Sequence, residues 1–420
     1  MVIFLLSHAM PKIKPFRGIR PNPVVVGKVV LQVENLSIES AKLIRQENPY
    51  SYVNMLVPKV EDKFMMGSKT ELAYKKINEN FEDFLERGIL IRDAKPSLYI
   101  YQVAHRGIVQ TGIWAITSID DYLNNTIKKH ELTRSDREKA LIDYLQQTGC
   151  DANPVLITYH PDKKVDQIIQ YTIKIKPNLS FTKEKANHKL WKIDDEASLN
   201  GLVKSLSQLK VSYIADGHHR AAAASLLGIE RRKMNLKHVG TEEYNFFTSV
   251  YMATDQLRIY PFHRLLKDTG DFTADEFLKQ LNKNFEVSPV KQPVKPSVLH
   301  EFGMYLSGNW FKLIAKPQTY HQNNPVAELD VSILQDLVLS PLIGINDPRT
   351  DSRISFVGGV IPVADLAESV DEGNFAVAFT LYPTSIEQLI RVADAGEVMP
   401  PKSTWFEPKF QAGLVIHQIS

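Results

Sequence analysis

The sequence has very little cysteine and no excess of charge. Its single cysteine, Cys150, excludes an internal disulfide, and with it the class of small secreted domains stapled by disulfides. A reactive thiol needs a lowered pKa, and Cys150 lies in a predicted turn without a basic neighbour, so we interpret it as incidental. The formal net charge of +2 gives no global field that would attract nucleic acid or membranes.

Long apolar runs are also missing. The apolar start, residues 1–9, lacks a basic segment and is too short for a signal peptide or a membrane span. Met10 opens a segment that resembles a natural start, which leaves open whether residues 1–9 are native. We therefore predict a soluble, cytoplasmic protein without a membrane partner. With 420 residues, of which 44% are hydrophobic, the chain can form about two to three domains with real cores.

Strand and helix signals mix along the chain, which predicts an α+β (mixed α/β) protein. Residues 98–104 and 109–117 are typical of a hairpin, and residues 245–253 and 257–265 of another. Residues 288–297 contain three prolines without a clear period, which is typical of a linker. We therefore predict two domains. Residues 1–287 would carry nucleotide or phosphate binding, and residues 288–420 would form a mixed α/β domain that carries a Met-Pro-Pro-Lys-Ser-Thr loop.

The segment at residues 216–220 is the most informative in the chain. Val211–Ala215 is a short apolar run typical of a buried strand, and the dipeptide Asp216-Gly217 breaks it. The residues from His218 to Leu227 favour a helix, and Gly228 stands where a glycine commonly ends one. The pattern therefore predicts a strand–turn–helix corner.

Such a corner can bind an anion. The first N–H groups of a helix have no partner, and the helix dipole adds positive charge. Gly217 lets a ligand approach the backbone, and Arg220 suits bidentate phosphate binding. His218 and His219 can donate hydrogen bonds or transfer protons near neutral pH. The alternative is that Asp216 only caps the helix and that the histidines belong to the surface or core.

Three other segments contain candidate residues. His130 and Glu131 precede a predicted helix, and Glu131 could bind a divalent cation or act as a base, although such a histidine is often merely exposed. His263 and Arg264 add positive charge at a strand end, unless they simply pack there. Lys402 lies in a proline-rich polar loop that is either functional or needed for the fold.

Several familiar motifs are absent. The sequence contains no Gly-x-x-x-x-Gly-Lys-Ser/Thr loop, no Rossmann glycine fingerprint and no His-Glu-x-x-His pair. Adjacent histidines on a helix point about 100° apart, so His218 and His219 do not form a chelating pair. A zinc site would therefore need distant ligands.

Several segments, in this order, resemble a bacterial family known as domain of unknown function 1015. The core motif is similar to that of a wider superfamily of ParB-type nucleotide-binding proteins, sulfiredoxins and free-serine kinases. There, a turn at a helix start holds nucleotide phosphates. The resemblance implies a ParB/sulfiredoxin-like core and phosphate binding. It covers most of the chain and rests on Pro15-Phe16-Arg17-Gly18, His130-Glu131-Leu132-Thr133, His188-Lys189-Leu190-Trp191, Ile214 to Arg220, Pro261-Phe262-His263-Arg264 and Met399 to Phe406.

The chain departs from this pattern at two places. The family's Pro-Tyr-Asp-Val-like segment corresponds to residues 32–37, where either Glu34 replaces the aspartate or the function of the aspartate is lost. The position of the sulfiredoxin cysteine is occupied by His218, so the resemblance does not imply cysteine chemistry.

The leading hypothesis is a phosphotransferase that uses ATP or ADP and acts on a small hydroxyl metabolite, in the manner of a serine kinase. Asp216, Glu34 and His218 are the predicted catalytic residues, and Mg²⁺ would bind through Glu131. One alternative is a nucleotide- or metabolite-binding regulator that turns nothing over. Another is a ParB-like DNA-associated protein, which the near-neutral charge and the lack of an evident helix-turn-helix disfavour. The predicted cofactor-binding residues are Gly217, His218, His219, Arg220, His130, Glu131, His263, Arg264 and Lys402.

Two geometric expectations follow. His130, Glu131 and the corner at residues 216–220 should line one cleft, so their side chains should lie within about 15 Å of one another, the reach of one small-ligand pocket. Arg220→Ala should remove phosphate affinity if Arg220 points outward, but should lower stability if Arg220 pairs with a carboxylate.

Overall fold

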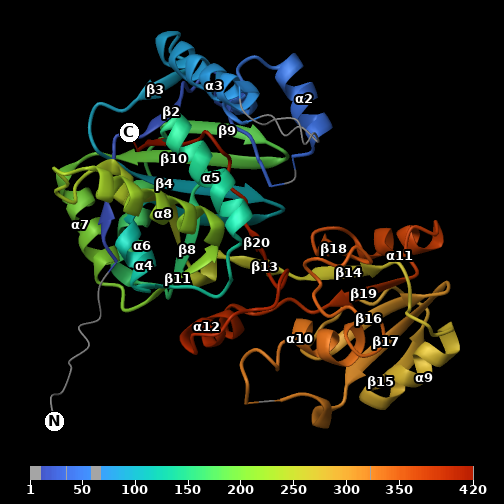
Figure 1. Cartoon of the computed structure of the whole chain (residues 1–420). Helices are drawn as coiled ribbons and strands as arrows, with labels where there is room; N and C mark the ends of the chain where they lie inside the picture. The colour runs from blue at the N-terminus through green and yellow to red at the C-terminus, as the bar shows by residue number, and fades with distance from the viewer. Residues whose placement is uncertain (1–10, 35, 58–67, 322, 420) are drawn as a thin grey trace, which may run out of the picture. The chain divides into compact units, whose positions relative to one another are not determined.

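The computed structural model describes residues 11–34, 36–57, 68–321 and 323–419, which divide into two compact units. Unit 1 comprises residues 1–257 and 408–420, and unit 2 comprises residues 258–407. Both units combine helices with strands, which confirms the predicted α+β class (Figure 1). Among the described residues, no helix has the length and apolarity needed to cross a bilayer.

Unit 1 is built on a mixed sheet with the order β6-β11-β8-β12-β5-β4-β10-β9, and β1 pairs with β5. The pairs β6–β11 and β8–β12 are parallel, and the other neighbours are antiparallel. The strands are β1 (Ile13–Lys14), β4 (Leu98–His105), β5 (Ile108–Ser118), β6 (Ile127–Lys128), β8 (Val155–Tyr159), β9 (Leu179–Lys183), β10 (Ala186–Ile193), β11 (Ser212–Asp216) and β12 (Phe246–Ala253). Two small pairs add β2 (Ile19–Pro21) with β3 (Leu90–Arg92), and β7 (Cys150–Asp151) with β21 (His417–Gln418).

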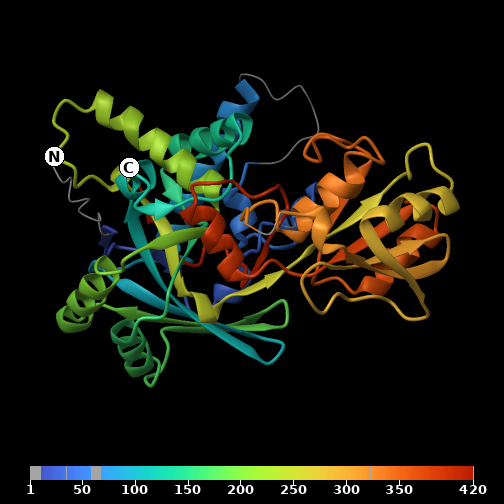
Figure 2. The same ribbon diagram turned by 90° about the horizontal axis from the view of Figure 1, so that it is seen from below.

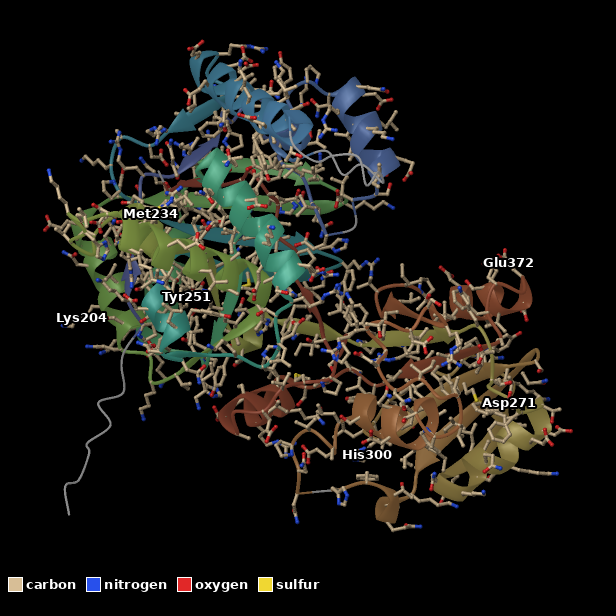
Figure 3. The ribbon with its side chains drawn as sticks, viewed as in Figure 1. Lys204, Met234, Tyr251, Asp271, His300 and Glu372 are labelled. Atoms are coloured by element: carbon tan, nitrogen blue, oxygen red, sulfur yellow. The ribbon has the colours of Figure 1, made fainter. Side chains whose placement is uncertain are left out.

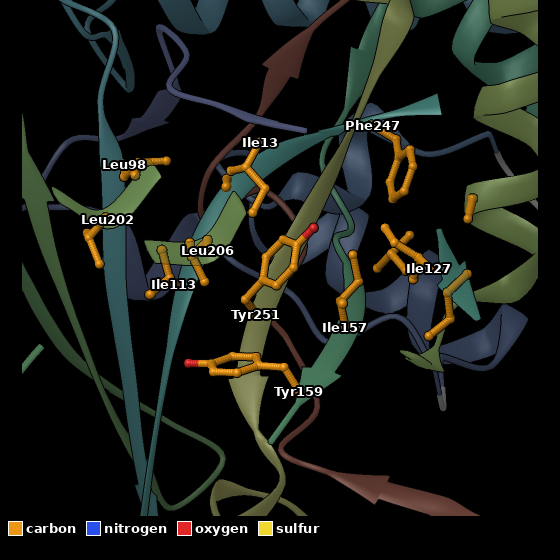
Figure 4. Close-up of a cluster of buried hydrophobic side chains, with 14 of the residues drawn as sticks. Ile13, Leu98, Ile113, Ile127, Ile157, Tyr159, Leu202, Leu206, Phe247 and Tyr251 are labelled. Carbon is orange, nitrogen blue, oxygen red and sulfur yellow. The ribbon is translucent and has the colours of Figure 1, made fainter. Parts of the chain in front are cut away.

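Helices pack on this sheet, and apolar side chains fill the space between them. Ile157, Phe247 and Tyr251 belong to the largest described cluster of buried side chains (Figure 4). Full burial of one such side chain stabilises the fold by about 1.5–3 kcal/mol. The helical segments are α1 (Val26–Val29), α2 (Ile38–Glu47), η1 (Tyr52–Met55), α3 (Ser68–Glu86), α4 (Ile119–Leu123), α5 (Ser135–Thr148), α6 (Lys163–Thr172), α7 (Glu196–Ser207), α8 (His218–Met234), η2 (Glu243–Asn245) and η3 (Thr254–Gln256).

Helix α8 is longer than predicted. It continues through Gly228 and ends at Met234, whose exposed side chain is labelled in Figure 3. Figure 2 shows it as an unbroken yellow-green helix. A Cβ at position 228 would lie 2.4 Å from Ile119 Cδ1 and 2.7 Å from the Tyr244 carbonyl oxygen. Gly228 therefore serves close packing against α4 and η2, and does not end the helix.

Unit 2 contains a six-stranded antiparallel sheet with the order β15-β17-β16-β19-β14-β18, and a two-stranded pair, β13 with β20. Its strands are β13 (Arg258–Tyr260), β14 (Phe262–Leu266), β15 (Phe285–Val290), β16 (Glu301–Leu306), β17 (Asn309–Ala315), β18 (Ile354–Gly358), β19 (Val377–Leu381) and β20 (Trp405–Glu407). Its helical segments are α9 (Ala274–Asn284), η4 (Pro317–Thr319), α10 (Asp330–Leu334), the π-helical turn η5 (Gln335–Leu339), α11 (Val363–Asp371) and α12 (Ile386–Asp394).

The division between the units differs from the predicted boundary at residues 287 and 288. Pro289 lies within β15, an edge strand paired with β17, because an edge strand tolerates a residue that cannot donate a hydrogen bond. The predicted hairpin of residues 245–253 with 257–265 is also wrong. Strand β12 pairs with β5 and β8 in unit 1, whereas β14 pairs with β18 and β19 in unit 2.

Candidate functional site

Residues 212–220 form the predicted strand–turn–helix corner. Strand β11 is buried from Ser212 to Ala215, and α8 begins at His218. Gly217 turns the chain with a φ of +99°, a left-handed conformation that favours glycine. The first N–H groups of α8 have no acceptor within the helix, so they lie at its positive end ready to bind an anion.

Charged side chains hold this corner together. Arg220 Nη2 lies 3.3 Å from Asp216 Oδ2, and Lys409 Nζ lies 3.3 Å from the same oxygen. Arg220 Nη1 also donates to Asn153 Oδ1 at 2.9 Å and to the carbonyl oxygen of Pro154. Arg220 is therefore engaged by the protein, and it pairs with a carboxylate. This is the arrangement for which its removal is expected to lower stability.

The two cations decide the ionisation of Asp216. Desolvation favours the protonated form, but Lys409 and Arg220 outweigh it and hold the pKa of Asp216 well below its usual range. A carboxylate this acidic is a poor acceptor for a substrate proton near neutral pH. The geometry therefore favours a positioning role for Asp216 over the catalytic one predicted from the sequence.

Lys409 was not among the predicted site residues. The lysine lies in Pro408-Lys409-Phe410, far from the corner in sequence and without a motif of its own. Residues 408–420 return to unit 1, and this return brings Lys409 to Asp216. No local signal in the sequence could have revealed the contact, since it depends on tertiary structure.

Glu34 is a second carboxyl group whose pKa depends on the charges of Arg220, Lys409 and Asp216. Desolvation raises its pKa, the charge of Asp216 adds to the rise, and Arg220 and Lys409 oppose it. A glutamate with a raised pKa is better matched to proton transfer near neutral pH than an ordinary one. The two cations and the burial therefore move the pKa values of the two carboxyl groups apart. The pKa of Asp216 is lowered, and the pKa of Glu34 is raised.

The predicted partner segment lies against the corner. The ring centroids of His130 and His218 are 4.4 Å apart, and the N–H of His130 lies 3.5 Å from His218 Nε2. Glu131 Oε2 lies 3.4 Å from His218 Nδ1, and His219 Nδ1 accepts a hydrogen bond from the N–H of Arg134 at 3.4 Å. Side chains from two distant segments therefore meet well inside the expected limit of about 15 Å.

Desolvation lowers the pKa of two of these imidazoles. Desolvation and the neighbouring His218 lower the pKa of His130 well below its usual value, and desolvation also lowers the pKa of His219. His130 Nδ1 is buried without a hydrogen-bond partner among the residues that the structure describes. A ligand at this corner would meet a neutral His130, and could satisfy an otherwise unpaired nitrogen.

A cavity of about 680 Å³ within unit 1 adjoins the corner. Its wall is mostly apolar and aromatic, with Tyr52 and Tyr144 among its residues, and Arg220, Asp151 and Asn153 contribute polar groups. This volume falls in the range of about 300–1,000 Å³ that is typical of small-molecule pockets. Arg220 therefore belongs both to the charged corner and to the cavity wall.

Cys150 also contacts this cavity, but its thiol is not activated. The residue is buried, and desolvation raises the pKa of the thiol to about 12. A thiolate nucleophile needs the opposite shift. The structure agrees with the interpretation of this cysteine as incidental.

A metal cage made of protein side chains does not fit this site. Within the described parts of the chain, no three His, Cys, Asp or Glu side chains gather as metal ligands. Glu131 offers one partly exposed carboxylate, and although desolvation raises its pKa, the neighbouring His218 lowers it by more. Mg²⁺ commonly binds through one or two carboxylates plus substrate phosphates and water, so Glu131 fits only a phosphate-held ion.

The remaining candidate residues belong to unit 2. His263 and Arg264 are buried in β14, where His263 Nδ1 accepts a hydrogen bond from the N–H of Leu381 at 3.3 Å. Desolvation lowers the pKa of His263 to about 4, so this histidine is neutral at neutral pH. The carbonyl oxygen of Lys402 accepts a hydrogen bond from Arg264 at 3.1 Å. Arg264 and Lys402 therefore contact each other within unit 2, whereas His263 contacts the neighbouring strand β19.

A family model described as "Protein of unknown function (DUF1015)" matches residues 13–332. The chain belongs to the DUF1015 family. The DUF1015 match includes the corner and the His130-Glu131 segment, whereas Lys402 and Lys409 lie beyond its end. No curated protein sequence matches this member.

Solved structures with distant similarity to this DUF1015 chain include a mutant of free serine kinase in complex with AMP. The sequences of the two proteins are 15% identical, and the TM-score is 0.37. The matched region covers 70% of this chain and 87% of the kinase chain. A conserved hypothetical protein from Pyrococcus furiosus shares 14% identity and a TM-score of 0.35, covering 70% of this chain and 90% of its own. C-terminally truncated SbnI from Staphylococcus aureus shares 11% identity and a TM-score of 0.36, covering 71% of this chain and 85% of its own.

Proposed function

We propose that unit 1 binds ATP or ADP at the start of α8 and transfers a phosphoryl group to a small hydroxyl metabolite. The observation that carries this proposal is the charged group at the corner. Two cations, Arg220 and Lys409, share one low-pKa carboxylate, Asp216, beside a 680 Å³ cavity. Arg220, Lys409 and Asp216 together carry a net charge of +1, which favours an anion. A ParB/sulfiredoxin-like core and a cytoplasmic location are parts of the same proposal.

Phosphoryl transfer depends mostly on positioning and charge stabilisation, and this corner offers both. The N–H groups of residues 218–220 would hold phosphate oxygens, and Arg220 would stabilise the charge that develops during transfer. Glu34 would accept the proton of the attacking hydroxyl group. At the same time the hydroxyl oxygen would bond to the transferred phosphorus, and the bond between this phosphorus and the rest of the nucleotide would break. Mg²⁺, held by Glu131 and the phosphates, would neutralise part of the phosphate charge.

His218 and His130 would position the ligand in this scheme. His218 is buried between His130 and Glu131, so it is held in one place by its neighbours. The buried Nδ1 of His130 offers a further polar contact. Glu131 and His218 would thus orient the first turn of α8.

A second candidate is a nucleotide-binding regulator that performs no transfer. The full pairing of Asp216 with Arg220 and Lys409 favours it, because a site built for binding alone needs no free base. Turnover of nucleotide in the presence of a hydroxyl substrate distinguishes the two candidates.

Thermal unfolding tests the binding step. At a concentration of about 100 times Kd, a ligand stabilises the fold by about 2.7 kcal/mol, or roughly 5–10 °C for a unit of this size. We expect such a rise with ATP or ADP, with and without Mg²⁺, and no rise with adenosine, which lacks phosphate. CTP and pyrophosphate show whether the base contributes. If no phosphate compound raises the melting temperature, the proposal is wrong.

A further inference from the structure

A buried arginine in unit 2, Arg264, forms no ion pair with a carboxylate among the residues that the structure describes. Arg264 is 3% exposed, and its Nη1 donates to the carbonyl oxygen of Phe262. Its Nη2 donates to the carbonyl oxygen of Lys402 at 3.1 Å, and its Cζ lies 5.2 Å from the centroid of the Phe356 ring. Among the residues described in unit 2, no carboxylate forms an ion pair with it. Desolvation alone lowers the pKa of its guanidinium to about 9.

This arrangement is unusual because a buried charge is costly unless it is paired. A guanidinium has five N–H bonds, and two of those in Arg264 have acceptors in the described structure. Within the described part of the chain, no acceptor contacts the other three. An anion that reached Arg264 would therefore gain charge-assisted hydrogen bonds and compensate a buried charge.

Arg264 lines a cavity of about 280 Å³ that lies entirely within unit 2. The second arginine on this wall, Arg349, is already paired with Asp347 at 2.9 Å, so the wall carries one unpaired positive charge. Most of the other lining residues are apolar, namely Val331, Leu339, Phe356, Pro348, Pro400 and Pro401.

Two irregular segments shape this cavity. Gln335 begins the π-helical turn η5, and its side-chain nitrogen donates to the carbonyl oxygen of Ile345 at 2.7 Å. Such turns are rare and occur frequently at functional sites. In a separate segment, Pro400 and Pro401 fix the backbone of a loop. The carbonyl oxygen of Lys402 in this loop accepts a hydrogen bond from Arg264. Both segments contribute residues to the cavity wall.

We propose that this cavity binds a small organic carboxylate, a monoanion with a short apolar body, whose carboxylate pairs with Arg264. The apolar wall suits the body of such a ligand, and one unpaired positive charge matches one negative charge. A phosphate group, which carries a charge of about −1.5 to −2 near neutral pH, would leave an excess of negative charge. This site is independent of the function proposed for unit 1.

Calorimetric titration of the full chain with benzoate, hexanoate and inorganic phosphate tests the proposal. We expect the carboxylates to bind and phosphate to bind more weakly. Arg264→Met retains volume but removes the charge, so we expect carboxylate affinity to fall by at least about tenfold. Asn346 is exposed on the cavity wall, and Asn346→Trp should weaken binding through steric filling while leaving Arg264 in place.

Arg391→Met serves as the matched control, because Arg391 is an exposed arginine of unit 2 that pairs with Glu328 away from this cavity. It should bind carboxylates as the wild type does. If Arg264→Met does not fold, Asn346→Trp decides. The proposal fails if the wild type binds neither carboxylate, if a folded variant at either cavity position binds them unchanged, or if phosphate binds more tightly than both.

Discussion

Glu34→Gln should reduce phosphoryl transfer by about 10²–10⁴-fold, the usual contribution of a general base. The amide cannot accept the hydroxyl proton, yet it keeps the size of the side chain. Nucleotide affinity should stay equal or rise, because a negative charge is removed beside Arg220 and Lys409. The measurement is ADP release from ATP with a panel of hydroxyl amino acids, including serine, together with a binding titration of the same variant.

The pH profile adds a second readout for Glu34. A base must be deprotonated, so kcat/KM should rise with pH through its pKa. Because the pKa of Glu34 is raised, this rise in kcat/KM should occur at a higher pH than it would with a glutamate of ordinary pKa. This rise should vanish in Glu34→Gln. Glu39→Gln, an exposed glutamate at the start of α2, is the matched control and should behave as the wild type. Equal turnover by both variants would remove Glu34 from the mechanism.

Arg220→Ala should lower both stability and phosphate affinity. The substitution removes hydrogen bonds to Asn153 and the Pro154 carbonyl oxygen, and half of the compensation of Asp216. Hydrogen bonds that involve a charged group are worth about 1.5–3 kcal/mol, so we expect a loss of this size in the free energy of unfolding. Nucleotide affinity, measured at a temperature where the variant is folded, should fall at least about tenfold.

Arg87→Ala provides a close control, because Arg87 pairs with Asp83 at the same four-residue spacing, but on an exposed surface. Exposed pairs of this kind contribute little, so its melting temperature should match that of the wild type. If Arg220→Ala and Arg87→Ala have the same melting temperature, Arg220 has no structural role. If Arg220→Ala is destabilised but retains full nucleotide affinity, Arg220 is structural only, and the phosphate site must be placed elsewhere.

Local features of the site could be predicted from the sequence. The change from an apolar run to Asp216-Gly217 and then to alanines predicts a strand, a turn and a helix, because each step depends on neighbouring residues. The proximity of His130 and Glu131 to the corner was predicted from their shared polar chemistry and the order of the family's motifs, and the contacts with His218 confirm it.

Features that depend on distant pairing could not be predicted. Lys409 reaches Asp216 because the last residues of the chain return to unit 1. The inward contacts of Arg220 depend on Asn153, which belongs to a different segment. Residues 245–265 have the pattern of a hairpin, but strand partners are chosen by the whole sheet, so β12 and β14 belong to different units.

The central claim is that phosphate binds the first N–H groups of α8, and amide NMR tests it directly. In protein labelled with ¹⁵N-histidine, the twelve histidines include His218 and His219, whose signals are assigned by single His→Gln variants. Addition of ADP should shift these two backbone amide signals, because each N–H gains a phosphate acceptor, and should leave the amide of His300 in unit 2 unchanged. Bound ADP that leaves the amides of His218 and His219 unmoved would contradict the account.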